Sequence, residues 1–241
     1  AELGRVYSFI LRSEVPGLTG EQAGLKRDVE IRLNDEIIKP KLPCVWDEER
    51  SVSYRGDDVN TIQKFSQELP DALVCEDCGH WHKNTLTLEA CDECGEKNLK
   101  SSKCRVWGWI GVQRYLDRID YGVNFIRNGR TIQARDKTIF EFFDPDTGAE
   151  DKDYPVEYPA DMGRIIGEVH CDHVGVDFVK SKFEEESAWT GVLSIVRGDS
   201  RLKPKFAKTK NESPLALIFN AYRINEPGIR YLIPGNGKNA I

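Results

Sequence analysis

Four of the seven cysteines have the spacing of a metal site. Cys75 and Cys78 form one Cys-x2-Cys pair, Cys91 and Cys94 form a second, and a glycine directly follows each pair. Two thiolates three residues apart on a tight turn can both reach one ion at about 2.3 Å, and two such turns complete a tetrahedral shell with no open position. The pattern therefore predicts a structural zinc ion (Zn2+) in a four-cysteine zinc ribbon at residues 73–98, in preference to an iron–sulfur or redox centre.

The other cysteines, and the histidines inside this segment, have simpler interpretations. His80 and His82 lie within the ribbon, but four cysteines already fill the shell, so we expect both rings at the surface. Cys44, Cys104 and Cys171 are predicted to be small buried hydrophobic side chains. The odd cysteine count argues against a complete set of disulfides, so we expect the cytoplasm or another reducing intracellular compartment.

Two lysines mark a second possible site. Lys180 directly precedes a stretch with helical spacing, in which Ser181 and Glu184 form a capping box. The N-terminus of a helix presents free N–H groups, and a lysine beside it makes an anion site. The sequence thus predicts a helix over 182–197 with Lys180 as a phosphate ligand at its start and Lys182 as the competing candidate.

The charge of the chain limits the possible function classes. The 241 residues include 34 Lys+Arg and 40 Asp+Glu, which gives a formal net charge of −6. A basic nucleic-acid binder is excluded as a description of the whole chain, because neutralising phosphates needs an excess of cations. Locally, residues 201–210 carry five positive charges and no acid, so they form either a solvated loop or a contact with phosphate. No apolar run reaches the roughly 20 residues that span a bilayer, so no membrane contact is expected.

The elements that must position these residues show both helical and extended patterns. Before the ribbon, the sequence predicts a helix in the first dozen residues, a half-buried strand at 29–33 and a loop with short edge strands at 45–68. After the ribbon, it predicts a central strand at 105–112, a hairpin at 121–133 around Asn128-Gly129, an acidic loop at 144–155 and a strand at 163–170. The helix at 182–197 follows, and then a helix or strand at 215–221. This mixture indicates an α+β fold.

Five segments carry a family resemblance. They are residues 3–7 (LGRVY), 29–40 (VEIRLNDEIIKP), 108–111 (GWIG), 121–132 (YGVNFIRNGRTI) and 176–184 (VDFVKSKFE). In this order they resemble the transducer domain of GHKL ATPases, the group that includes gyrase B, MutL, the ninety-kilodalton heat-shock chaperone and the MORC proteins. The resemblance spans roughly residues 1–198 and is interrupted by the ribbon.

The resemblance implies both a fold and a function. The fold is a transducer with a ribosomal-protein-like two-layer sheet plus helices, in which residues 1–72 form the first part, 73–98 the zinc-ribbon insertion, 99–200 the second part and 201–241 a basic loop and C-terminal extension. Lys180 falls on the transducer lysine that contacts the γ-phosphate of ATP, which the neighbouring domain holds with Mg2+. Members of the family commonly dimerise on ATP, so the resemblance also implies a homodimer.

The sequence departs from the family in two respects. Ser181 stands where the family has Gln. No Asp-x-Gly-x-Gly motif and no glycine-rich lid occur, so we expect this chain to be the C-terminal part of a longer protein and not to hydrolyse ATP alone. Its partner would be the N-terminal ATPase domain of the same protein. The competing hypothesis is a non-enzymatic zinc-ribbon adaptor that binds protein, or binds nucleic acid through residues 201–210.

Overall fold

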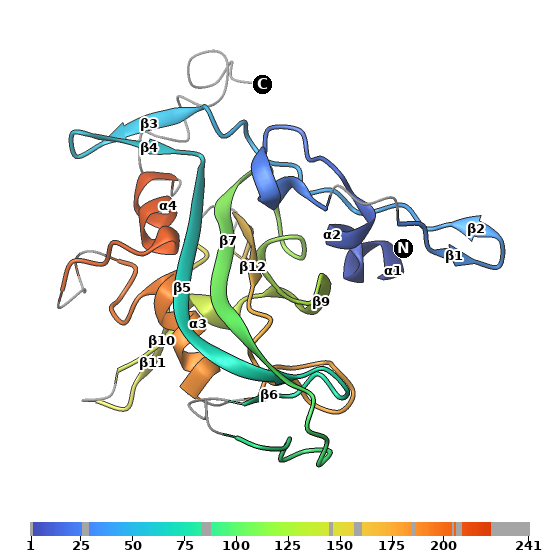
Figure 1. Cartoon of the computed structure of the whole chain (residues 1–241). Coiled ribbons are helices and arrows are strands. Elements are labelled where there is room, and N and C mark those ends of the chain that lie inside the picture. Colours follow the sequence, from blue (N-terminus) through green and yellow to red (C-terminus); the bar gives the residue numbers. More distant parts are fainter. Residues whose placement is uncertain are drawn as a thin grey trace.

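A curled six-stranded sheet forms the centre of the fold (Figure 1). In order across the sheet, its strands are β6 (Trp81–His82), β5 (Ile62–Cys75), β7 (Leu99–Asp117), β12 (Gly163–His170), β8 (Gly122–Arg127) and β9 (Arg130–Asp136). Strands β12 and β8 are parallel, and the other neighbours are antiparallel. The computed structural model describes residues 2–25, 29–82, 88–144, 147–156, 161–184, 187–203, 205 and 209–222.

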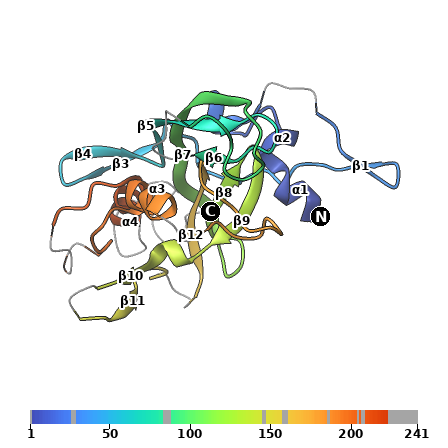
Figure 2. The same cartoon turned by 60° about the horizontal axis from the view of Figure 1, so that its bottom comes forward.

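Helices lie on both faces of this sheet. Helices α3 (Ser187–Arg197) and α4 (Pro214–Tyr222) cover one face, and the short α1 (Glu2–Val6) and α2 (Ser8–Leu11) lie on the other side (Figure 1 and Figure 2). The fold is therefore mixed α+β, as predicted, and consists mostly of sheet. The resemblance implies a two-layer arrangement of sheet and helices, whereas here the N-terminal helices also lie on the second face of the sheet. In the described part of the chain, no helix is both long and apolar enough to cross a membrane.

Short hairpins and turns of 3-10 helix complete the described elements. The hairpins are β1 (Arg32–Leu33) with β2 (Glu36–Ile37), β3 (Ser51–Tyr54) with β4 (Asp57–Asn60), and β10 (Glu141–Phe143) with β11 (Glu150–Lys152), and the 3-10 turns are η1 (Gly20–Ala23) and η2 (Thr138–Phe140).

The middle of the central strand β7 is buried on both faces, which explains the apolar run there. Val106, Ile110 and Val112 belong to the main core, whereas Trp109 packs with the N-terminal segment on the opposite face. Successive side chains of a strand point to opposite faces, so neighbouring positions of β7 each hold one layer in place. The predicted central strand at 105–112 is confirmed as part of this longer one.

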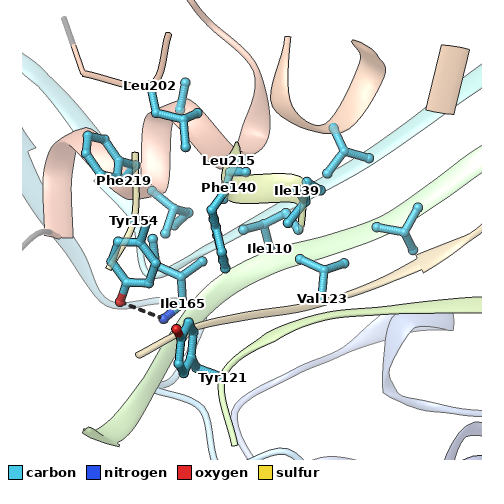
Figure 3. Packing of buried hydrophobic residues seen from close by; sticks show 14 of the residues in the cluster. Ile110, Tyr121, Val123, Ile139, Phe140, Tyr154, Ile165, Leu202, Leu215 and Phe219 are labelled. Atoms are coloured by element: carbon cyan, nitrogen blue, oxygen red, sulfur yellow. Dashed lines mark hydrogen bonds between the residues drawn. The ribbon is translucent and has the colours of Figure 1, made fainter. Parts of the chain in front are cut away.

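The main core lies between the sheet and the helices α3 and α4 (Figure 3). The ring of Tyr154 packs at centroid distances of 4.9 Å from Phe140 and 6.2 Å from Phe219. Its hydroxyl accepts hydrogen bonds from the backbone N–H groups of Arg164 and Ile165, at 2.7 and 3.3 Å. A buried hydroxyl is costly without a partner, so these bonds fix Tyr154 against the start of β12.

A buried ion pair fastens the N-terminal segment to the other face. Both terminal nitrogens of the Arg12 guanidinium donate to the Glu168 carboxylate of β12, and Trp109 Nε1 donates to the same group at 3.1 Å. Beside this pair, the ring of His170 stacks on Trp107 with centroids 3.8 Å apart. Burial and the charge of Arg12 lower the pKa of His170 to about 3, so the ring is neutral in the core.

Several predicted elements are confirmed. Asn128 and Gly129 join β8 to β9 with φ angles of 49° and 77°, the left-handed conformation that a two-residue type I′ turn requires. The strand predicted at 163–170 is β12, and the helical alternative at 215–221 is α4.

Three other predictions are only partly right. The region at 29–33 does contain a strand, but it is the short β1, which is exposed and not half-buried. The region at 45–68 contains the predicted short strands β3 and β4, but it also includes the first half of the long strand β5, whose polar residues face solvent. The acidic region at 144–155, predicted as a loop, contains the short strand β11, which pairs with β10.

Candidate metal centre and lysine loop

The four cysteines lie at one end of the longest hairpin of the sheet. Strand β5 ends at Cys75 and β7 begins at Leu99, and these two residues are paired across the ladder. The chain between them contributes only the two-residue strand β6 to the sheet among its described residues. This four-cysteine segment, residues 75–95, therefore closes the end of a rigid β-ladder.

Both cysteine pairs form the same kind of tight turn. Gly79 donates its backbone N–H to the carbonyl of Cys75 at 2.9 Å, and Gly95 donates to Cys91 at 2.8 Å. Both glycines have positive φ angles, 73° and 77°, which is the conformation that lets the backbone fold back around an ion. The first cysteine of each pair also donates its N–H to the carbonyl five residues later, at 2.9 and 2.7 Å.

The sulfur positions match a tetrahedral shell. The Cys75 and Cys94 sulfurs lie 3.6 Å apart, those of Cys78 and Cys91 lie 3.5 Å apart, and all four lie within 4.8 Å of one another. Zinc–sulfur bonds of about 2.3 Å at tetrahedral angles place neighbouring sulfurs about 3.8 Å apart. The segment can therefore hold one metal ion, and the residues fit structural zinc.

The acid–base properties of these thiols also favour a bound cation. Desolvation disfavours the Cys91 thiolate, but N–H groups of Cys94 and Glu93 and the His82 ring outweigh it, and the pKa of Cys91 falls to about 6. The N–H of Glu96 favours the Cys94 thiolate, yet desolvation and the three neighbouring sulfurs raise the pKa of Cys94 to about 12. Thiolates this close repel each other, so a dication is needed before all four can ionise together.

His82 is not the surface residue that the sequence predicts. It pairs with Leu73 of β5, its ring is buried, and its Nε2 lies 3.3 Å from Cys91 Sγ. Next to a thiolate acceptor, this nitrogen would be the donor, so His82 is placed to support Cys91 from outside the shell if the segment holds a metal ion. No spacing rule reveals this contact, because the pairing of β6 with β5 creates it. His80, in contrast, is exposed as predicted.

Of the other three cysteines, two are buried and one is exposed. Cys104 and Cys171 are buried, as predicted, and burial raises the pKa of both thiols. Cys44 is exposed, so its predicted burial is wrong. It directly precedes Val45, and Val45 takes the buried position in the core on the N-terminal face.

Lys180 does not lie at the start of a helix. The first described residue of α3 is Ser187, and Lys180 lies in a turn with a φ angle of 55°. The predicted capping box is also wrong, because residues 181–184 are not helical, and the Ser181 hydroxyl instead donates to the Asp177 carboxylate at 2.7 Å. The predicted end of the helix is confirmed, since Gly198 follows α3 with a φ angle of 71°.

Residues 176–183 form what we call the lysine loop. An isolated β-bridge joins Val176 to Phe183 at its base. The Asp177 carboxylate accepts backbone N–H groups from Ser181 and Lys182, at 2.6 and 3.1 Å, in addition to the Ser181 hydroxyl. These bonds lower the pKa of Asp177, so the carboxylate is charged at neutral pH and holds the turn. Lys180 and Lys182 are both exposed on it.

A cavity lies between the four-cysteine segment and the base of the lysine loop. Cys78, His80 and Asp92 line it from one side, and Gly175 and Glu184 from the other. Two regions far apart in the sequence therefore share one face of the molecule.

The basic residues at 201–210 are partly neutralised. Arg201 donates to the buried Asp153 carboxylate at 2.9 Å and to Asp151 at 2.7 Å, and Lys210 pairs with Glu212 at 2.5 Å. Pro204 and residues 206–208 lie outside the described residues, as do residues 223–241 of the predicted extension. In the described part of this loop, much of the positive charge is therefore paired with carboxylates of the same chain.

Comparisons with known proteins do not place the chain in a family. No family model matches its sequence, and no curated protein matches it. The segments quoted above remain the basis of the GHKL resemblance.

Proposed function

We propose that this chain is the transducer part of an ATP-dependent GHKL-type molecular clamp, and that Lys180 contacts the γ-phosphate of ATP held with Mg2+ by a nucleotide-binding domain of the same protein. The observation that supports this best is the lysine loop, in which Asp177 holds a turn that exposes Lys180. A charge on a preorganised turn reaches a phosphate with little further loss of conformational freedom.

The chemical role of Lys180 is electrostatic. Its ammonium group supplies a point charge near oxygens that carry negative charge in phosphoryl transfer, and it loses this contact on hydrolysis. The chain supplies this one group, so we expect no ATP turnover without the nucleotide-binding domain. Family members dimerise on ATP, and we propose a nucleotide-gated homodimer on the same grounds.

The base of the lysine loop offers a route for transmitting movement. Phe183 is buried, and its ring stacks on Trp189 of α3 with centroids 4.9 Å apart. Both rings meet Phe125 of β8 edge to face, at 6.4 and 4.7 Å. A displacement of the loop therefore presses directly on α3 and on the central sheet, because packed interiors transmit strain. This contact is how the proposed clamp would couple the lysine to domain rotation.

The four-cysteine segment is proposed to be a structural zinc ribbon. It provides four thiolates and no open position, so its expected role is to close the end of the β5–β7 hairpin. Zinc would fix the two turns that now depend on a few backbone hydrogen bonds.

The alternative function is a non-enzymatic adaptor that binds protein or nucleic acid. We favour the transducer because Arg201 and Lys210 are paired with carboxylates, which leaves less charge for phosphate contacts. The four-cysteine segment itself also carries acidic residues, among them Asp92 and Glu93. Strong, salt-dependent binding of a DNA or RNA fragment by this chain would reverse that preference.

The decisive variant is Lys180→Ala in the complete gene product. We expect ATP turnover to fall roughly tenfold or more, because the lost charge acts where the reaction develops negative charge. Lys182→Ala is the matched control, since Lys182 has the same chemistry and is also exposed in the same loop. Its turnover should change by less than about twofold. Unchanged turnover in Lys180→Ala would remove the proposed role, and a loss confined to Lys182→Ala would move it to Lys182.

A further inference from the structure

A second cavity lies between the N-terminal helices and the sheet. Its lining includes residues of α1, α2, β7, β8, β9 and β12, together with residues 41–44, which follow the β1–β2 hairpin. None of the described residues that line it also lines the cavity at the base of the lysine loop. Its volume is about 70 Å³, well below the roughly 300–1,000 Å³ of pockets that enclose organic ligands. The cavity therefore has room for a small ion and not for a whole nucleotide.

Three cations in the wall of this cavity share one carboxylate. Arg5 and Arg135 each donate from Nη1 to Asp120 Oδ1, at 3.2 and 2.6 Å, and Lys41 Nζ lies 2.5 Å from the other oxygen. Burial disfavours the charged form of Asp120, but Lys41 and Arg135 outweigh it and lower its pKa, so this carboxylate is ionised at neutral pH. The group carries three positive charges against one negative charge.

The surplus of two positive charges is not offset by the second acid of the described lining. That acid, Glu168, already accepts both terminal nitrogens of Arg12. Like charges held close together in a partly buried site repel each other, and the Arg5 and Arg135 side chains are only 19% and 28% exposed. An anion in the cavity would relieve this repulsion.

The cations also have donors to offer an anion. A guanidinium has five N–H groups in a planar fork. Within the part of the chain that the structure describes, the side chains of Arg5 and Arg135 make hydrogen bonds through Nη1 alone. Their remaining N–H groups are therefore open to a ligand that enters between them.

The backbone is shaped to place Arg135 in this wall. Arg135 has a φ angle of 53°, and its backbone N–H donates to Asn124 Oδ1 at 2.8 Å, where the pairing of β8 with β9 is irregular. Gly122 leaves room for this path, since a Cβ there would lie 2.7 Å from the Arg135 carbonyl oxygen. Strained conformations and bulges that redirect a side chain are concentrated at functional sites.

We propose that Arg5, Lys41 and Arg135 form a binding site for a phosphate group. Phosphate is favoured over a carboxylate because the three cations come from three separate segments, and a tetrahedral oxyanion offers an oxygen to each of them. Bound phosphate would link α1 and the segment at Lys41 to β9 of the central sheet. This inference does not rest on the proposed function, since it uses neither Lys180 nor ATP.

The test is a calorimetric titration of this chain with inorganic phosphate, with chloride added to hold the ionic strength constant. Lys41→Ala and Arg135→Gln should each weaken binding roughly tenfold or more, because each removes a charged hydrogen bond to the ligand. Lys41 is 44% exposed, so Lys41→Ala should fold even if Arg135→Gln does not. The matched control is Arg105→Gln, which removes an arginine that pairs one to one with Glu21, and should leave the affinity within about twofold.

Cys44 reports where the phosphate binds. It is exposed and lines this cavity, so bound phosphate should slow its labelling by the uncharged reagent N-ethylmaleimide in proportion to occupancy, as measured by mass spectrometry of the peptide that contains it. Lys180→Ala should leave both the affinity and this protection unchanged. Glycerol phosphate in place of inorganic phosphate distinguishes the source, because equal affinity identifies the phosphate group of an ester as a ligand and weaker binding identifies the free ion.

Four results would overturn the site. They are no binding of phosphate by the unmodified chain at millimolar concentration, unchanged affinity in Lys41→Ala, unchanged labelling of Cys44 when phosphate is bound, and a loss in Lys180→Ala as large as that in Lys41→Ala. The last would place the ion at the lysine loop. Tighter binding of acetate than of phosphate would replace phosphate by a carboxylate as the ligand.

Discussion

Replacing His82 by alanine should weaken zinc binding although His82 is not a ligand in the proposed site. The ring is 4% exposed and its Nε2 lies 3.3 Å from Cys91 Sγ, so it supports a thiolate that belongs to the shell. The substitution removes this donor. It also leaves a space between β6 and the cysteine turns, because His82 is one of the two residues, Trp81 and His82, that form β6.

The expected loss of zinc affinity depends on which groups still contact the Cys91 sulfur after the substitution. Loss of a partner outside the shell typically reduces metal affinity by about 10- to 100-fold, or about 1.4 to 2.7 kcal/mol. Cys91 keeps backbone donors at Glu93 and Cys94 and its contact with Cys78, so His82 is one of four groups that stabilise its thiolate. We therefore expect His82→Ala to fall near the lower limit, roughly 10- to 30-fold.

The measurement is a competition for zinc between the protein and a chromophoric chelator of known affinity. His80→Ala is the matched control, because the same residue type stands two positions earlier and is exposed. Its affinity should change by less than about twofold. Equal affinities for both variants would show that the buried ring has no role at the metal, and would refute the reasoning from the contact with Cys91.

Two further predictions concern metal removal and pH. Metal analysis should find one zinc per chain, and chelation should greatly speed hydrogen exchange over 75–98 but not over 105–112, since structural zinc contributes on the order of 10 kcal/mol to its own site. Four free thiols and no metal would contradict this. The pKa of His170 is about 3 in the folded chain and 6.5 ordinarily, so the unfolded chain takes up the proton first as pH falls. Unfolding free energy should therefore be unaffected by this group above pH 6.5 and fall by about 2 kcal/mol by pH 5, as measured by urea denaturation. His170→Phe, which keeps a ring on Trp107, should lack this loss, and an equal loss in that variant would refute the assignment.

The elements that the sequence predicts correctly are those whose signals are local. Asn128-Gly129 specifies its own turn, and the apolar run at 105–112 requires burial on both faces whatever the neighbours are. The stripe that predicts α3 is equally local, because Val192 and Val196 face the core one turn apart.

The elements that the sequence misses depend on distant partners. Strand β5 contains a polar stretch between Ile62 and Cys75, and its pairing with β7 makes it a strand in spite of this composition. The capping box at Ser181 does not form because Asp177 organises a different turn, in which its carboxylate accepts the N–H groups of Ser181 and Lys182 and the Ser181 hydroxyl. At both positions the sequence pattern is present, but a contact with another part of the chain determines the observed structure: the pairing with β7 for β5, and the turn held by Asp177 for Ser181.

The same distinction applies to the candidate sites. The four cysteines can be recognised because a metal shell needs particular residue types at particular spacings. The contribution of His82 could not be recognised, because it arises from the register in which β6 pairs with β5. The exposure of Phe178 was also hidden, since a helix beginning near Ser181 would have placed this residue in a short connection and not at the tip of a turn.

The four-cysteine segment and the base of the lysine loop lie on one face of the molecule. They line the same cavity, with Cys78 and His80 on one side and Gly175 and Glu184 on the other. Since the four-cysteine segment is anchored on the β5–β7 ladder and the loop on Phe183, both sides of this face rest on the same sheet and core. Their relative position is then set by the fold itself, which is the rigidity that the proposed phosphate contact of Lys180 would require.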